Sequence, residues 1–234
     1  MIRVAATVVP YDSPETCGDF FIHDRNSDND LIVLGDVGGH GSSALPVIAR
    51  ECREVILRHR KADLRRIVSR VDGLESLKRT GLVLCVARFH HRLSLFEYVA
   101  VGNLKLYLVR DGAIRRQPIQ EGIVGYTLPK TLRVNVIKMV RGDSILAVSD
   151  GVTVGERWLG ALPWTDASLD ELLSEIAGSD HANEDDRSAL LVQAFTDVIG
   201  ASVARTAPAR DEARHKGRKK KIAPRSRRSS GGAQ

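Results

Sequence analysis

Short apolar runs separated by tight polar turns recur along the first 200 residues, and this pattern constrains the fold more than any other feature. Apolar runs of this length, bounded by turn-forming residues, are typical of β-strands. The Asp- and Asn-rich segment Asp24–Asp30 predicts a hairpin between two of them. We expect strands at Ile2–Val9, Phe20–His23, Leu31–Gly35, Gly81–Phe89, Leu93–Val101, Leu104–Arg110, Leu132–Met139, Ser144–Val148 and Ser188–Phe195.

The short turns also suggest which strands pair. The three runs over 81–110 are typical of an antiparallel meander, and the two runs on either side of Arg141-Gly142-Asp143 are expected to pair with each other. Apolar residues at helical spacing predict helices over Ser43–His59, over Asp63–Leu77 and around Leu169–Ile176, with Ser42 or Ser43 and Asp63 as caps. Many antiparallel strands with few helices indicate an α+β fold rather than a doubly wound α/β fold.

The net charge of +6 is unevenly distributed along the chain. Residues from Arg205 onward include 11 basic and 2 acidic residues, whereas residues 1–204 include 24 basic and 27 acidic ones. We therefore expect one folded domain over 1–200 and a disordered basic tail over 201–234, because the tail has almost nothing to bury. Such a tail either binds an acidic partner protein or nucleic acid, or is only a solvated extension. It has no interleaved aromatic residue for base stacking, which makes nucleic acid the weaker choice.

Cysteine content and hydropathy indicate a cytoplasmic protein. No segment approaches the roughly 20 apolar residues that cross a bilayer, and the first residues lack the layout of a signal peptide. We expect no membrane partner. The three cysteines, Cys17, Cys52 and Cys85, have no paired spacing, which predicts reduced thiols, at least two of them buried.

The apolar run Leu31–Leu34 ends on Asp36, inside the glycine-rich turn Gly35-Asp36-Val37-Gly38-Gly39-His40-Gly41. Glycines let the backbone approach a bound ion closely, so Asp36 is a candidate metal ligand. Three more acidic turns lie at the ends of predicted strands: Asp19, Asp150 and the pair Asp185-Asp186. Each carboxylate alone is explained as a turn former or a cap. Together they favour a centre for hard divalent cations, which need several oxygen ligands.

Four segments carry a family resemblance. They are Cys17-Gly18-Asp19-Phe20-Phe21, the turn at Asp36, Val148-Ser149-Asp150-Gly151-Val152-Thr153 and Asp185-Asp186-Arg187-Ser188-Ala189-Leu190. In this order they resemble the motifs of the PPM metal-dependent serine/threonine phosphatases, and most of all the SpoIIE and RsbX-like bacterial branch. Gly102-Asn103, Gly122–Gly125 and Arg141-Gly142-Asp143-Ser144 also follow the order of that branch.

The resemblance implies a fold and a metal site. The fold would be an antiparallel β-sandwich flanked by helices, in four layers. Two Mg²⁺ or Mn²⁺ ions would lie at one end of the sandwich, with Asp36 bridging them. Asp19 and the backbone carbonyl of Val37 would complete one ion site, and Asp150 with Asp185 would complete the other. Whether Asp185 or Asp186 is the ligand stays open.

The resemblance also implies an activity. A water shared by two divalent ions is acidified towards hydroxide and would attack phosphoserine or phosphothreonine directly. His40 would either protonate the leaving alkoxide or only order the loop. No arginine is assigned to hold the phosphate; Arg3 is one candidate. The expected function is protein-serine/threonine phosphatase activity on a phosphorylated regulatory protein in a bacterial partner-switching or stress-signalling pathway. The alternatives are a phosphatase-like binding module that works through the basic tail, and another two-metal hydrolase such as a phosphodiesterase.

Overall fold

The computed structural model describes residues 1–39, 41–164, 168–178 and 185–195. The chain divides into two units, Met1–Gly200 and Ala201–Gln234, and the second lies wholly outside the described residues. The predicted basic tail over 201–234 therefore stays a prediction. No helix in the described part of the chain is both long and apolar enough to cross a membrane.

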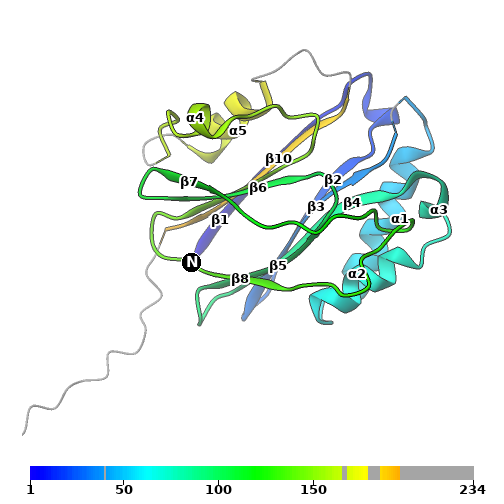
Figure 1. Ribbon diagram of the computed structural model, residues 1–234, viewed down its shortest axis with the longest axis horizontal. Helices are drawn as coiled ribbons and strands as arrows, with labels where there is room; N and C mark the ends of the chain where they lie inside the picture. Colours follow the sequence, from blue (N-terminus) through cyan, green and yellow to red (C-terminus); the bar gives the residue numbers. More distant parts are fainter. Residues whose placement is uncertain (40, 165–167, 179–184, 196–234) are drawn as a thin grey trace, which may run out of the picture. The chain divides into compact units, whose positions relative to one another are not determined.

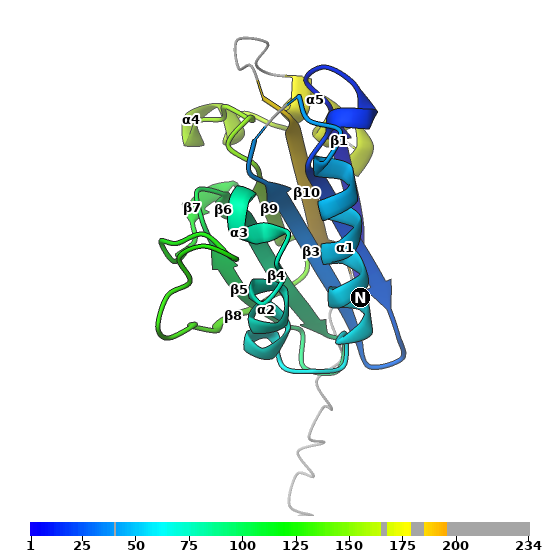
Figure 2. The same cartoon turned by 90° about the vertical axis from the view of Figure 1, so that its right-hand side faces the viewer.

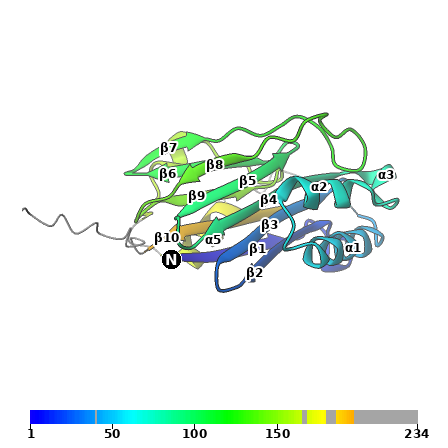
Figure 3. The ribbon, with the colours of Figure 1, turned by 90° about the horizontal axis from the view of Figure 1, so that it is seen from below.

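Two five-stranded antiparallel sheets form the centre of the first unit (Figure 1). In the first sheet the strand order is β1 (Ile2–Val9), β10 (Arg187–Ala194), β9 (Ser144–Val148), β6 (Lys105–Arg110) and β7 (Ala113–Arg116). In the second it is β2 (Asp19–Arg25), β3 (Asn29–Val37), β4 (Leu82–His90), β5 (Leu95–Val101) and β8 (Asn135–Lys138). Figure 3 shows β1 and β2 at one edge of the two sheets and β7 and β8 at the other.

Helices cover the outer face of each sheet. The second sheet carries α1 (Leu45–Arg58), α2 (Leu64–Asp72) and the short α3 (Leu77–Thr80), and Figure 2 shows α1 running along β3. The first sheet carries α4 (Glu156–Leu159) and α5 (Leu169–Gly178), and a 3₁₀ turn, η1, spans Pro14–Thr16. The fold is thus the predicted four-layer sandwich, with helices outside two antiparallel sheets.

Three apolar cores match these layers. One lies between the second sheet and α1 and α2, one between the two sheets, and one between the first sheet and α4 and α5. Val33 of β3 belongs to the helix-side core, whereas its neighbours Ile32 and Leu34 belong to the core between the sheets. Because both faces of β3 are buried, its sequence is a continuous apolar run rather than an alternating one.

Two predicted strand pairings are wrong. The runs over 132–139 and 144–148 do not pair with each other, because β8 pairs with β5 while β9 lies between β10 and β6. The meander is also divided, since β5 and β6 belong to different sheets. A short turn between two strands looks the same in sequence whether it closes a hairpin or passes from one sheet to the other. The corner at Asp143 is held by Arg110, whose Nε and Nη2 donate to its carboxylate at 2.8 and 2.6 Å.

Smaller differences concern the ends of elements. β3 continues through Asp36 and Val37, so Asp36 lies within a strand and not in the turn after it. The N-cap residue of α1 is Ala44, which has no side chain that can cap the helix. The predicted cap by Ser42 or Ser43 is therefore wrong. Asp63 does cap α2, accepting from the Arg66 N–H at 3.0 Å. The second predicted helix ends early, at Asp72, because Gly73 interrupts it.

All three cysteines are free and buried, which confirms the expectation of reduced thiols. Burial raises the pKa of each thiol to about 12, so none is a thiolate at neutral pH.

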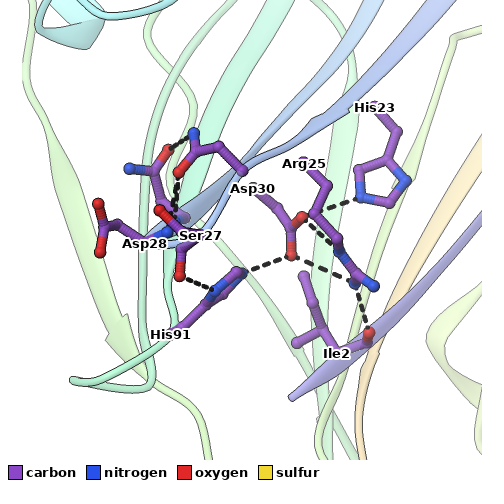
Figure 4. Close-up of polar contacts among 9 residues, drawn as sticks. Ile2, His23, Arg25, Ser27, Asp28, Asp30 and His91 are labelled. Carbon is purple, nitrogen blue, oxygen red and sulfur yellow. Dashed lines mark hydrogen bonds and ion pairs between the residues drawn. The ribbon is translucent and has the colours of Figure 1, made fainter.

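A buried carboxylate organises the end of the sandwich that lies at the β2–β3 hairpin (Figure 4). Asp30 is fully buried and accepts from Arg25 Nε at 2.8 Å, with His23 Nε2 at 3.3 Å and His91 Nε2 at 3.0 Å. Arg25 Nη2 also donates to the carbonyl of Ile2 in the other sheet. Burial alone would raise the pKa of Asp30, but the bonds from His23, Arg25 and His91 hold it well below its usual range. This cluster joins both sheets at the hairpin end.

Replacing Asp30 with asparagine should lower the free energy of unfolding by about 2–4 kcal/mol, because an amide donor would face cationic and N–H donors in a buried site. A lowered pKa contributes stability above about pH 4, the unfolded value, and that contribution is lost as the pH falls further towards the folded pKa. Urea unfolding of wild type and Asp30→Asn should therefore differ at neutral pH and converge in acid. Asp28→Asn, an exposed change on the same hairpin, is the control. Equal stability of Asp30→Asn and wild type at pH 7 would contradict this role.

Candidate metal centre

The second sheet brings two of the predicted carboxylates together. Asp19 begins β2 and Asp36 lies near the end of β3, and the two residues are directly opposite each other in the antiparallel pairing. Directly opposed residues on neighbouring strands direct their side chains to the same face, with Cβ atoms about 4.5–5.5 Å apart. Two like charges in this position disfavour each other unless a cation lies between them.

The first sheet supplies the other two carboxylates at the same end of the sandwich. Asp150 follows β9, Asp185 precedes β10, and these strands are paired neighbours. Beyond the pairing, the Ser149 N–H donates to the Ser188 carbonyl at 3.0 Å and the Ser188 N–H to Ser149 Oγ at 2.9 Å. A Cβ on Gly151 would lie 2.1 Å from the carbonyl oxygen of Asp186, so only glycine allows this close approach of the two turns.

The structure separates the roles of Asp185 and Asp186. The carboxylate of Asp186 is buried and accepts from the backbone N–H groups of Tyr11 and Gly18, both at 2.9 Å. These bonds tie the start of β10 to the connection between β1 and β2. Asp185 instead lines a cavity with Asp36 and Asp150. Asp185 is therefore the better candidate ligand, and Asp186 holds the two sheets together.

The cavity at this end has a volume of about 480 Å³. Its wall includes Asp36 from β3, Asp150 and Asp185 from the first sheet, and Glu121 from the segment between β7 and β8. None of the described residues that line it is a lysine, arginine or histidine. A cavity of this size accommodates a phosphorylated side chain, but its charge is negative.

Burial and mutual repulsion change the acidity of the two paired carboxylates. Burial raises the pKa of Asp19 to about 7, and the nearby Asp186 carboxylate adds to the rise. Burial also raises the pKa of Asp36 well above its usual range, with further contributions from Asp19, Asp150 and Asp185. All three of the other predicted acidic ligands thus contribute to the raised pKa of Asp36. A shared electrostatic environment of this kind is typical of functional sites.

Unsatisfied carboxylate oxygens show that the donor set fits a cation. Both oxygens of Asp19 and Oδ1 of Asp150 are buried and lack a hydrogen-bond partner. Leaving such oxygens unpaired costs about 1–3 kcal/mol each, more for charged groups. Among the described residues no three His, Cys, Asp or Glu side chains already stand at coordination spacing, so Asp36, Asp150 and Asp185 share a cavity without converging on one point. Hard oxygen donors in this number suit Mg²⁺ or Mn²⁺.

Asn103 is a site residue to which the sequence analysis gave no role. It lines the cavity, and its Nδ2 donates to Oδ2 of Asp150. Asn103 lies in the turn where the chain passes from β5 in one sheet to β6 in the other. This hydrogen bond orients Asp150 and leaves its other oxygen for a ligand. Asparagine is too common in turns to be identified as functional from sequence. Glu121, which also lines the cavity, was missed because a glutamate in a loop is equally common.

Three further predictions have different outcomes. His40 lies outside the described residues, so its role stays open. Val37 ends β3 with a fully buried side chain, and the predicted metal-binding role of its backbone carbonyl stays a prediction. Arg3 is not at the cavity: its guanidinium lies 5.0 Å above the ring of Phe195, at the opposite end of β1 from the strand end near Asp185. The suggestion that Arg3 holds the substrate phosphate is therefore wrong.

Comparisons with known proteins agree with this geometry. The family model for stage II sporulation protein E (SpoIIE) matches residues 26–195, a range that includes Asp36, Asp150 and Asp185 but not Asp19. No curated protein sequence gives a significant match.

Several solved structures share the fold. RsbX in complex with magnesium is 17% identical with a TM-score of 0.67, over 82% of this chain and 94% of that one. The PP2C phosphatase domain with a regulatory fragment of SpoIIE from Bacillus subtilis is 14% identical with a TM-score of 0.69, over 82% and 63%. A chain from work on the bacterial stressosome, described as a modular system adapted to control secondary messenger signaling, is 23% identical with a TM-score of 0.70, over 82% and 100%.

These TM-scores establish a common fold, and the family model spans well over half of the chain. The ordered acidic motifs, the four-layer sandwich and the family match therefore lead to one conclusion: the chain belongs to the SpoIIE family and shares its fold with RsbX and with the PP2C phosphatase domain of SpoIIE.

Proposed function

We propose that this chain removes phosphate from phosphoserine or phosphothreonine on a regulatory protein, in a bacterial partner-switching or stress-signalling pathway. The observation that carries the proposal is the single cavity walled by Asp36, Asp150 and Asp185, next to the buried, unpaired carboxylate of Asp19. Similar folds in RsbX and in a chain from the bacterial stressosome support the pathway assignment.

In this proposal two Mn²⁺ or Mg²⁺ ions bind at the acidic end of the sandwich. Asp36 would serve both ions, Asp19 and the Val37 carbonyl would hold one, and Asp150 and Asp185 would hold the other. When bound, the ions supply an acidified water and neutralise the phosphoryl oxygens. Phosphorylated side chains are dianionic near neutral pH. All ionisable side chains among the described residues of the cavity wall are acidic. Substrate binding should therefore require the divalent ions.

The remaining residues of the site act on the carboxylates. Asn103 donates to Asp150 and fixes which of its oxygens faces the cavity. Asp186 holds the strand end that carries Asp185 against the connection that leads to Asp19. Both contacts keep ligands from different sheets in register, which is the positioning that a two-ion centre needs.

The sequence alternative of a binding module that works through the basic tail concerns residues 201–234, outside the described residues. The buried, unpaired carboxylates favour the enzyme, because a module that binds through its tail has no need to retain costly buried charges. The proton donor to the leaving alkoxide stays unassigned, with His40 as its candidate.

Asp36→Asn and Asp150→Asn should each lower phosphate release from a phosphoserine protein in the presence of Mn²⁺ by at least about 100-fold. We expect this because partners that merely orient metal ligands already cost about 10–100-fold when lost. Released phosphate measured over time gives the rate. Asp28→Asn, an exposed change at the other end of β3, should keep wild-type activity. Full activity in both site variants would refute the two-ion mechanism.

The metal-free protein should become more stable when a repelling charge is removed. Asp36→Asn without divalent ions should melt roughly 2–4 °C above wild type, the shift that about 1 kcal/mol produces in a domain of this size, because the carboxylate that feels Asp19, Asp150 and Asp185 is gone. Added Mn²⁺ should raise the melting temperature of wild type and not that of the variant. Thermal denaturation with and without Mn²⁺ tests both statements. An equal rise for both proteins would place the ions elsewhere.

Asn103→Ala should raise the Mn²⁺ concentration needed for half-maximal activity by roughly 10–100-fold, because Asp150 loses the bond that orients it. The maximal rate at saturating Mn²⁺ should fall less. A Mn²⁺ titration of the hydrolysis rate measures the change, with Gln117→Ala, at a half-buried amide outside the cavity wall, as the control. An unchanged Mn²⁺ requirement would show that this bond is dispensable.

A further inference from the structure

We propose that Ile123 and Tyr126, on one turn beside the cavity, contact the substrate next to its phosphorylated residue and select an apolar side chain there. This inference rests on the proposed phosphatase function and goes beyond it by naming a feature of the substrate. It follows from the exposure and hydrogen bonding of the segment 117–134, which joins β7 to β8.

The turn lies at the cavity. Ile123 lines the cavity wall beside Gly122 and Glu121, and 41% of its surface is exposed. Tyr126 is three residues further on and is 74% exposed, more than any other large hydrophobic residue in the described part of the chain. An exposed aromatic side chain beside a binding cavity is a common feature of recognition sites, because it offers a large contact area at a small entropic cost.

The backbone of the turn is firmly held. The Ile123 N–H donates to the Thr127 carbonyl at 3.0 Å, and the Thr127 N–H donates back at 2.7 Å. Val124, fully buried, exchanges bonds of 2.9 and 3.0 Å with Leu82 at the start of β4. The turn is therefore anchored to the sheet that carries Asp36.

A second anchor comes from the helix layer. The Gly125 N–H donates to Oδ1 of Asp72, the last residue of α2, at 2.7 Å. Gly125 has φ of +86°, and a Cβ there would lie 2.3 Å from Cβ of Leu77, so no other residue fits. Since Val124 and Gly125 are locked against the body of the domain, Tyr126 is presented outward from a rigid base. Rigid presentation reduces the entropy lost on binding.

The charge around the turn also restricts which residue can lie next to the phosphorylated residue of the substrate. Glu121 lies at the cavity wall together with Asp36, Asp150 and Asp185. An acidic residue next to the phosphorylated one would be repelled by Glu121, whereas a large apolar one can cover the exposed faces of Ile123 and Tyr126. The favoured substrate is thus a phosphoserine or phosphothreonine segment with a large apolar neighbour and without an acidic one.

Three synthetic phosphoserine peptides that differ only in the residue beside phosphoserine, as leucine, serine or aspartate, test this selection with Mn²⁺. For wild type, kcat/KM should be about 5–30-fold higher for the leucine than for the serine peptide, the range that 1–2 kcal/mol of contact energy gives, and lowest for the aspartate peptide. Tyr126→Ala should reduce the leucine preference to less than twofold, and Tyr126→Phe should keep it. Leu93→Ala, at an exposed leucine in the β4–β5 turn far from the cavity, should also keep it.

The outcomes separate the two proposals. Phosphate release at equal kcat/KM from the leucine and serine peptides by wild type, or the same leucine preference in Tyr126→Ala as in wild type, would overturn the selection while leaving the phosphatase activity in place. No phosphate release by wild type from any peptide or from p-nitrophenyl phosphate would overturn the proposed function and this inference together.

Discussion

The carboxylate of Asp186 accepts backbone hydrogen bonds from Tyr11 and Gly18, and the acidic end of the sandwich depends on this link. The first sheet provides Asp150 and Asp185, the second provides Asp19 and Asp36, and the four come together only if the two sheets are held in register at this end. A charge-assisted bond to two backbone N–H groups is stronger than a neutral one and needs no second side chain. The Asp30 cluster performs the same joining role at the hairpin end, so the sandwich is fastened at both ends.

The acidic cluster is electrostatically costly, and that cost indicates its purpose. Burial raises the pKa of Asp19 to about 7, burial and three acidic neighbours raise the pKa of Asp36 well above its usual range, and Asp19 has two buried oxygens without partners. Core residues placed only for stability would not be arranged in this way. The Asp30 carboxylate is the contrast within the same molecule, because it is also buried but has cationic and N–H donors on its oxygens, and its pKa is lowered. One carboxylate is satisfied by the chain itself, whereas the others are suited to ions from outside it.

Much of the fold could be predicted from sequence because β3 and its neighbours are buried on both faces and therefore have continuous apolar runs. The sheet crossings at Gly102-Asn103 and at Arg141-Gly142-Asp143 could not, since a turn sequence does not say which sheet the next strand joins. The choice between Asp185 and Asp186 depended on the backbone of distant Tyr11 and Gly18, which no local pattern encodes. Asn103 was missed for a related reason: its partner, Asp150, is remote in sequence, and only the crossing from β5 to β6 brings the two together.

The number of ions bound is the most direct test of the metal centre. Calorimetric titration of the metal-free protein with Mn²⁺ should show two ions per chain. Asp36→Asn, which removes the carboxylate shared by both sites, should abolish measurable binding or leave one weak ion. Asp28→Asn should bind as wild type does. Two ions bound with unchanged affinity in Asp36→Asn would contradict a centre built on this carboxylate.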